Sequence, residues 1–103
     1  MALTKQYLKS KPVCKVTFSL PAEAVNDSKE VALVGDFNEW NAGSATPLKK
    51  QKDGSYKTTL ELEPGKEYQY RYILDGSKWI NDWAADKYVP SGNSSDENSV
   101  VVL

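Results

Sequence analysis

The sequence predicts an all-β domain, an antiparallel β-sandwich of the immunoglobulin type with about seven strands. Short segments with alternating apolar and polar residues recur along the chain, and turn-forming residues separate them. No long stretch has the 3.6-residue period of an amphipathic helix. The 103 residues are enough for one such domain and leave no room for a second.

The first strand is predicted between residues 11 and 20. Four apolar residues alternate there with polar ones: Cys14, Val16, Phe18 and Leu20. This period of two is typical of a strand with one buried face. Residues 1–11 lack the pattern, and we expect them to form a flexible or loosely docked arm, with residues 12–103 as the domain. Pro21 ends the strand, and we interpret residues 22–28 as a polar loop in preference to a short helical turn.

Three further strands are predicted in the middle of the chain, the first of them at residues 30–34. Residues 56–62 and 67–74 are joined by a Pro-Gly turn, and we expect these two strands to pair antiparallel. Four residues of the last strand should share one face: Tyr68, Tyr70, Tyr72 and Leu74. Arg71 points the other way, where the sheet should be solvated.

After Trp79 the chain is rich in Asn, Asp, Ser, Pro and Gly as far as Asn98, which predicts irregular structure. Residues 99–103 have the composition of a closing strand.

Composition excludes several function classes. The 13 basic and 14 acidic side chains nearly balance, so nucleic acid and anionic membranes are not expected partners. Because histidine and the usual nucleophile and phosphate motifs are absent, we predict no enzyme, no metal site and no cofactor. A glycosidase-like pair among the turn carboxylates is conceivable, but we interpret them as solvated turn residues. They are Asp36, Glu39, Asp75, Asp82, Asp86 and Asp96.

Cys14 is the single cysteine, so an internal disulfide is excluded and a reducing compartment is favoured. We interpret its side chain as a small buried hydrophobe. The sequence contains neither a signal-peptide core nor an apolar stretch long enough to span a membrane. We therefore expect a cytoplasmic protein.

Two tryptophans follow predicted strands directly, at turns. Trp40 ends the run of residues 35–40, and Trp79 follows an Asp-Gly turn. A flat indole face suits the apolar C–H patches of a pyranose ring, which makes a sugar the natural ligand. The alternative is that both indoles only cover the ends of the sandwich. Phe37 is the expected core anchor of the first turn.

These motifs, in this order and spacing, resemble carbohydrate-binding module family 48. This family includes isoamylase N-terminal early-set domains, the equivalent domains of glycogen branching enzymes and the glycogen-binding domain of AMP-activated kinase β subunits. The resemblance covers roughly residues 12–103. It is carried by GDFNEW at residues 35–40, YQYRYILDG at residues 68–76 followed by Trp79, and ENSVV at residues 97–101.

The resemblance implies an early-set sandwich that binds α-1,4-linked glucans such as glycogen or starch fragments. It implies that Trp40 and Trp79 are stacking platforms, that Arg71 contacts sugar hydroxyls, and that Asn98 is the hydrogen-bonding asparagine of the family. For Arg71 the alternative is an ordinary solvated strand charge. Two neighbouring residues are added as candidate ligand contacts, Lys78 and Trp83. For Trp83 the alternative is a structural role.

The sequence departs from the kinase domains at two places. Asp96 stands where they have threonine, in a loop without their apolar residues, and the turn from Asp75 to Trp79 is one residue longer. Many relatives adjoin a glycosidase barrel of about 250 residues, which this chain lacks, so we expect a stand-alone module. Its expected partners are an α-glucan and a glucan-metabolising enzyme. The alternative function is a protein-docking or scaffold module associated with such enzymes, with weak or no sugar binding.

Overall fold

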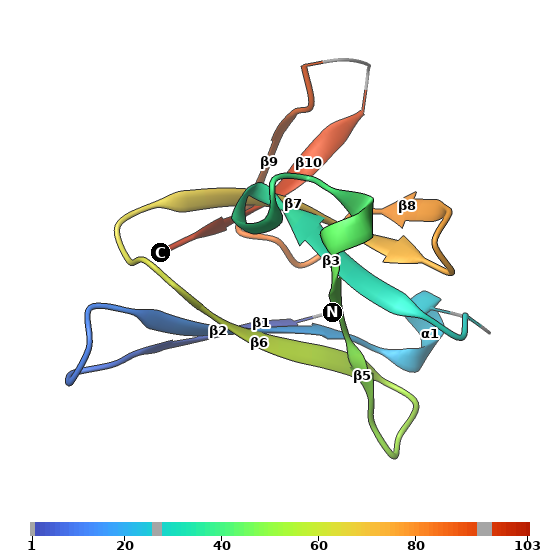
Figure 1. Cartoon of the computed structure of the whole chain (residues 1–103), viewed down its shortest axis with the longest axis horizontal. Helices are drawn as coiled ribbons and strands as arrows, with labels where there is room; N and C mark the ends of the chain where they lie inside the picture. The colour runs from blue at the N-terminus through green and yellow to red at the C-terminus, as the bar shows by residue number, and fades with distance from the viewer. Residues whose placement is uncertain (1, 26–27, 93–95) are drawn as a thin grey trace.

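The computed structural model describes residues 2–25, 28–92 and 96–103, which form two antiparallel sheets facing each other (Figure 1). This confirms the predicted all-β, immunoglobulin-like sandwich. The first sheet has the order β1 (Ala2–Tyr7), β2 (Cys14–Leu20), β6 (Tyr56–Leu62) and β5 (Lys49–Lys50). The second has the order β4 (Thr46–Pro47), β3 (Val31–Gly35), β7 (Glu67–Leu74), β10 (Glu97–Val102) and β9 (Lys87–Pro90), with β8 (Lys78–Ile80) paired to β7.

The core lies between the two sheets and is built by the alternation seen in the sequence. The four apolar residues predicted to point inward from β2 are fully buried: Cys14, Val16, Phe18 and Leu20. From the second sheet, Tyr70 and Tyr72 are equally buried, as expected for one face of β7. Phe37 packs on this core, with its ring centroid 5.9 Å from that of Phe18, as expected of an anchor.

The prediction of a flexible or loosely docked arm at residues 1–11 is wrong for β1. This strand pairs with β2 along its whole length, from Ala2 opposite Ser19 to Tyr7 opposite Cys14. Its apolar alternation is broken because Lys5 occupies a position opposite the buried Val16. The Lys5 ammonium reaches across to the other sheet and donates to the Asp86 carboxylate at 2.6 Å. A charged side chain on an edge strand also discourages pairing with another chain.

The antiparallel pair predicted for β6 and β7 is also wrong, because the two strands belong to different sheets. Residues 63–66 carry the chain from one sheet to the other rather than around a hairpin. The crossing is held by main-chain bonds to the last residue: Gly65 N donates to Leu103 O at 3.1 Å, and Leu103 N donates to Lys66 O at 3.0 Å. The place beside β7 is thereby left to β10.

Two segments predicted to be irregular contain regular structure. Ala22–Val25 form the short helix α1, because Val25 is buried in the core and Ala24 N donates to Pro21 O at 3.0 Å. The second segment includes β9, which pairs with β10 on one side only.

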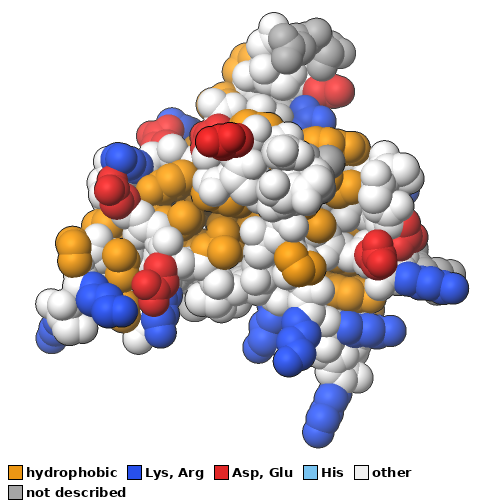
Figure 2. All heavy atoms as spheres, in the orientation of Figure 1, with side chains coloured by type: hydrophobic (Ala, Val, Ile, Leu, Met, Phe, Trp, Pro, Cys, Tyr) orange, Lys and Arg blue, Asp and Glu red, His pale blue; other side chains and the backbone are white. Residues whose placement is uncertain are grey.

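Charged side chains of both signs are spread over the face shown in Figure 2, as their near balance in the sequence suggests. Lysines gather at the lower end of this view, where Figure 1 places the hairpin of β5. Among the residues that the structure describes, no helix is long and apolar enough to cross a membrane.

Candidate functional site

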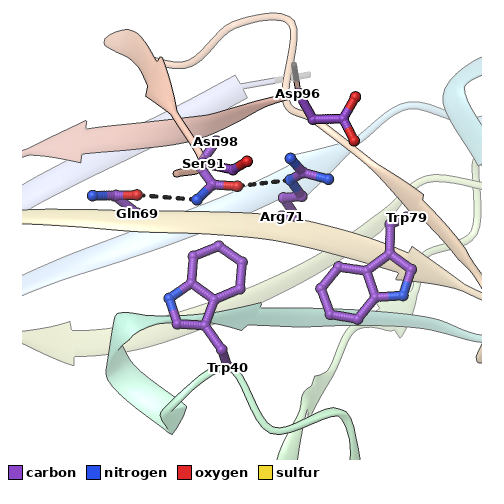
Figure 3. Close-up of a pocket in the computed structure, with 7 residues that line it drawn as sticks. All are labelled: Trp40, Gln69, Arg71, Trp79, Ser91, Asp96 and Asn98. Carbon is purple, nitrogen blue, oxygen red and sulfur yellow. Dashed lines mark hydrogen bonds between the residues drawn. The ribbon is translucent and has the colours of Figure 1, made fainter. Parts of the chain in front are cut away.

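An open pocket of about 390 Å³ lies on the outer face of the second sheet. Its walls come from the loop after β3, from β7 and β8, and from the segments that flank β9 and β10. Seven of the described residues line it: Trp40, Gln69, Arg71, Trp79, Ser91, Asp96 and Asn98. Figure 3 shows the two indoles side by side, with Gln69, Asn98 and Arg71 in a row next to them.

The loop after β3 fixes Trp40 by its backbone and by its ring. The 3₁₀ helix η1 (Asp36–Asn38) follows β3, and then Glu39 and Trp40 both take left-handed backbone conformations, with φ of 60° and 57°. This conformation is costly for non-glycine residues and persists only where contacts with the surrounding structure enforce it. The indole Nε1 donates to Asp36 Oδ1 at 2.8 Å, so the plane of the ring is set before any ligand arrives.

Asp36 also ties this loop to the middle of the sheet, since its Oδ2 accepts a bond from Gln69 N at 2.8 Å. Asn38 closes the loop from the other side: its Oδ1 accepts from Gly35 N at 2.9 Å and its Nδ2 donates to Leu33 O at 3.0 Å. At Gly35 the loop lies directly on β7, where an added Cβ would come within 2.3 Å of Gln69 O. The residues of the GDFNEW run therefore act together to seat Trp40.

Trp79 is presented by the hairpin of β7 and β8, where it lies directly opposite Ile73. Asp75 and Gly76 have φ of 49° and 74°, and Ser77 N donates to Leu74 O at 3.1 Å, which is the pattern of a type I′ turn. The Trp79 side chain is 42% exposed. Its indole nitrogen makes no hydrogen bond within the described part of the chain.

A row of hydrogen-bonded polar side chains runs beside the indoles. Asn98 Nδ2 donates to Gln69 Oε1 at 3.0 Å, and Asn98 Oδ1 accepts from Arg71 Nε at 2.8 Å. The Arg71 guanidinium also donates through Nη2 to the carbonyl of Glu97 at 2.7 Å. These bonds hold the guanidinium in place, and its Nη1 group makes no hydrogen bond to the described residues.

A second apolar layer lies beneath the pocket. Three residues of the second sheet are almost completely buried although they do not belong to the core between the sheets: Val34, Ile73 and Val100. By strand alternation they face outward, on the side that carries the indoles. The platform therefore rests on packed side chains, which favours a preformed site.

Behind the polar row lies a buried network that sequence reasoning missed. Asp82 is fully buried, and its Oδ2 accepts from the hydroxyls of Tyr70 at 2.8 Å and Tyr72 at 3.5 Å. Asp82 N donates to Ser99 Oγ at 2.9 Å, and Tyr88 donates to Asp82 O at 2.6 Å. Burial, and next the Asp82 carboxylate, raise the pKa of the Tyr70 and Tyr72 hydroxyls far above the usual range.

The interpretation of the acidic residues as solvated turn carboxylates is therefore wrong for Asp82. It is incomplete for three others, whose carboxylates accept main-chain hydrogen bonds: Asp36, Asp75 and Asp86. Among the described residues, no group of three or more potential ligands is placed to hold a metal ion.

Four of the candidate residues come together in the pocket: Trp40, Arg71, Trp79 and Asn98. Lys78 is exposed on β8 next to Trp79, and Trp83, 60% exposed, lies between β8 and β9; neither lines the pocket. Gln69 was missed, although its place two residues before Arg71 puts it on the same face of β7. Ser91 and Asp96 also line the pocket. They belong to the loop whose sequence differs from that of the kinase domains, and residues 93–95 of this loop lie outside the described part of the chain.

A β-sandwich with an open pocket of aromatic and polar side chains is the architecture of a binding module. The family model for the glycogen recognition site of AMP-activated protein kinase matches residues 23–102, so the chain belongs to this family. This membership supports carbohydrate binding by the domain.

Among curated proteins, the chain is 32% identical over 79 residues to Protein PTST homolog 2, chloroplastic, from Arabidopsis thaliana, covering 76% of this chain and 13% of that protein. It is 38% identical over 73 residues to the 1,4-alpha-glucan branching enzyme GlgB of Aquifex aeolicus, covering 63% of this chain and 11% of the enzyme. The chain thus spans about an eighth of the length of these relatives.

Among solved structures, a candidate alpha amylase from Salmonella typhimurium matches with a TM-score of 0.63 and 21% identity. The match covers 96% of this chain and 14% of that one. At this level of identity the likeness concerns the fold.

Proposed function

We propose that the domain binds α-1,4-linked glucans, such as glycogen, starch or maltooligosaccharides, in the pocket on the second sheet. The observation that carries this proposal is the combination of two indoles and a polar row in one open pocket. A sugar ring has apolar C–H faces and hydroxyl groups at its edge. The indoles can contact the faces, and the polar side chains can form hydrogen bonds with the hydroxyls. One relative is a 1,4-alpha-glucan branching enzyme, which supports the choice of glucan.

In this proposal Trp40 and Trp79 stack on successive glucose rings. Arg71 donates from its Nη1 group to sugar hydroxyls. Asn98, itself bonded to Gln69, holds the guanidinium, and both amides offer atoms at the pocket edge. Because these groups are already bonded to one another, little side-chain entropy is lost when the sugar arrives.

The expected affinity is modest. Burial of part of each indole contributes about 1 to 2 kcal/mol, and ordering of the oligosaccharide opposes it, so we expect a Kd of roughly 10 µM to a few mM. We propose a glucan-metabolising enzyme as the second partner, because one relative is a branching enzyme that contains a segment similar to this chain.

The test is a titration with maltoheptaose and β-cyclodextrin, followed by tryptophan fluorescence, with cellohexaose as the control for linkage. We expect saturable quenching by the two α-glucans and none by cellohexaose. Trp83→Ala is the matched control, because it removes an exposed indole that does not line the pocket. No response to any sugar at several millimolar would refute the proposal and favour a protein-docking module.

A further inference from the structure

A second recess lies on the same outer face, next to the pocket. It has a volume of about 170 Å³. Among residues 2–25, 28–92 and 96–103, five line it: Glu30, Ala32, Ala45, Ile73 and Gly76. Three of these five are alanine or glycine, so the recess exists because its walls are small side chains.

The strand register makes the recess continuous with the site. Ala32, Ile73 and Trp79 are direct partners across β3, β7 and β8 and form one row on the sheet. The next outward row contains Val34 and Arg71. Alternate residues of a strand are about 7 Å apart, so the recess begins one row beyond Arg71. It shares its row with Trp79, which lines the pocket.

The walls of the recess are fixed by main-chain bonds. The turn of β7 and β8 is bound to the start of β3, because Asp75 Oδ1 accepts from Lys29 N at 2.8 Å and from Glu30 N at 2.9 Å. In return Asp75 N donates to Glu30 O at 2.8 Å. The recess is thus preformed, and its position relative to Trp79 is set by the hairpin that carries both.

We infer that this recess is an extension subsite for the same α-glucan chain, so that the module prefers linear chains longer than the pocket alone can hold. The inference rests on the proposed function. The recess offers a sugar apolar contacts at Ala32 and Ile73, and Glu30 at its wall supplies acceptor oxygens for hydroxyls. Its small residues admit a sugar ring that larger side chains would exclude.

The experiment compares maltotetraose with maltoheptaose by isothermal titration calorimetry, in wild type and in two variants that fill the recess, Ala32→Ile and Ala45→Leu. We expect wild type to bind maltoheptaose roughly fivefold more tightly than maltotetraose. Both variants should lose this gain, while their Kd for maltotetraose changes less than about twofold. β-Cyclodextrin has as many glucose units as maltoheptaose but is a closed ring, so its binding should not respond to the variants.

Ala84→Ile is the matched control, since it adds the same bulk at an exposed loop position outside both hollows. The amide chemical shifts of Ala32, Ala45 and Gly76 should change when maltoheptaose is added and should not change when maltotetraose is added. The inference would be overturned if wild type bound maltoheptaose no more tightly than maltotetraose, or if the variants kept the tighter binding of maltoheptaose. It would also be overturned if both variants lost affinity equally for the two oligosaccharides. Failure of wild type to bind either oligosaccharide would overturn the proposed function as well.

Discussion

Trp40 and Trp79 line the same pocket but are supported in different ways. Trp40 is held by a left-handed backbone and by the bond from its Nε1 to Asp36, in a loop tied to β7. Trp79 is 42% exposed and is placed by its strand, without a hydrogen bond from its indole to a described residue. One platform is therefore fixed in orientation before binding, whereas the other is fixed only in position.

The largest effect that separates the two supports should come from Gly35→Ala. The added Cβ would meet Gln69 O at 2.3 Å and Tyr70 Cα at 2.9 Å, and these main-chain atoms cannot rotate away. We expect the free energy of unfolding to fall by about 3 kcal/mol or more. Urea denaturation measures this loss. A variant with wild-type stability would show that the Trp40 loop does not depend on its close contact with β7.

Next in size is the contrast between Trp40→Ala and Trp79→Ala. A ring that is already oriented loses less entropy on binding, so we expect Trp40→Ala to abolish detectable binding of maltoheptaose with the fold intact. Trp79→Ala should weaken binding by roughly fivefold to tenfold, about 1 to 1.4 kcal/mol. Calorimetry measures both, with circular dichroism as the check on folding. Equal losses would remove the proposed difference between the platforms, and unfolding of Trp40→Ala would assign that indole to the core.

A smaller effect is expected from Asp36→Asn, which keeps the shape of the side chain. Both carboxylate oxygens accept N–H groups, so an amide places a donor against one of them. We expect binding to weaken about fivefold, near 1 kcal/mol. The Trp40 indole N–H resonance should shift in the free protein. Glu39→Gln removes a charge from the same loop and should change neither property; if it matches Asp36→Asn, the effect is one of charge.

The smallest effect should come from Gly76→Ala in the other turn. No atom lies within 4 Å of an added Cβ there, and the cost is the positive φ of 74° alone. A loss of about 1 kcal/mol in stability is expected, with binding of maltotetraose changed less than twofold. Thermal denaturation and calorimetry provide the two values. A loss as large as that of Gly35→Ala would mean that both turns are equally tight.

The sequence predicted those parts of the molecule in which one residue type repeats at the period of a strand. The fold class and the alternation of β2 and β7 followed from this. The grouping of Arg71 with the two tryptophans was instead implied by the family resemblance. β1 was missed because Lys5 lies at an inward position and is neutralised by Asp86 from the other sheet. That partner is distant in sequence, so no local pattern reveals it.

The sheet assignment of β6 and β7 could not be read from a Pro-Gly turn, since the same turn residues serve a hairpin and a crossing between sheets. Asp82 was judged by its residue type, which is usually exposed, whereas two tyrosine hydroxyls from β7 make its burial possible. The cytoplasmic location stays a prediction, and so do the ligand-binding roles of all six candidate residues: Trp40, Arg71, Lys78, Trp79, Trp83 and Asn98.

The carbonyl oxygen of Glu97 accepts hydrogen bonds from two directions. Arg71 Nη2 reaches it from the pocket at 2.7 Å, and Asn81 Nδ2 reaches it at 2.7 Å from the segment that carries the buried Asp82. The side chain of Glu97 is exposed and takes no part. Because the acceptor is a main-chain atom, a substitution of the Glu97 side chain would keep the atom that joins the exposed pocket to the segment of the buried Asp82.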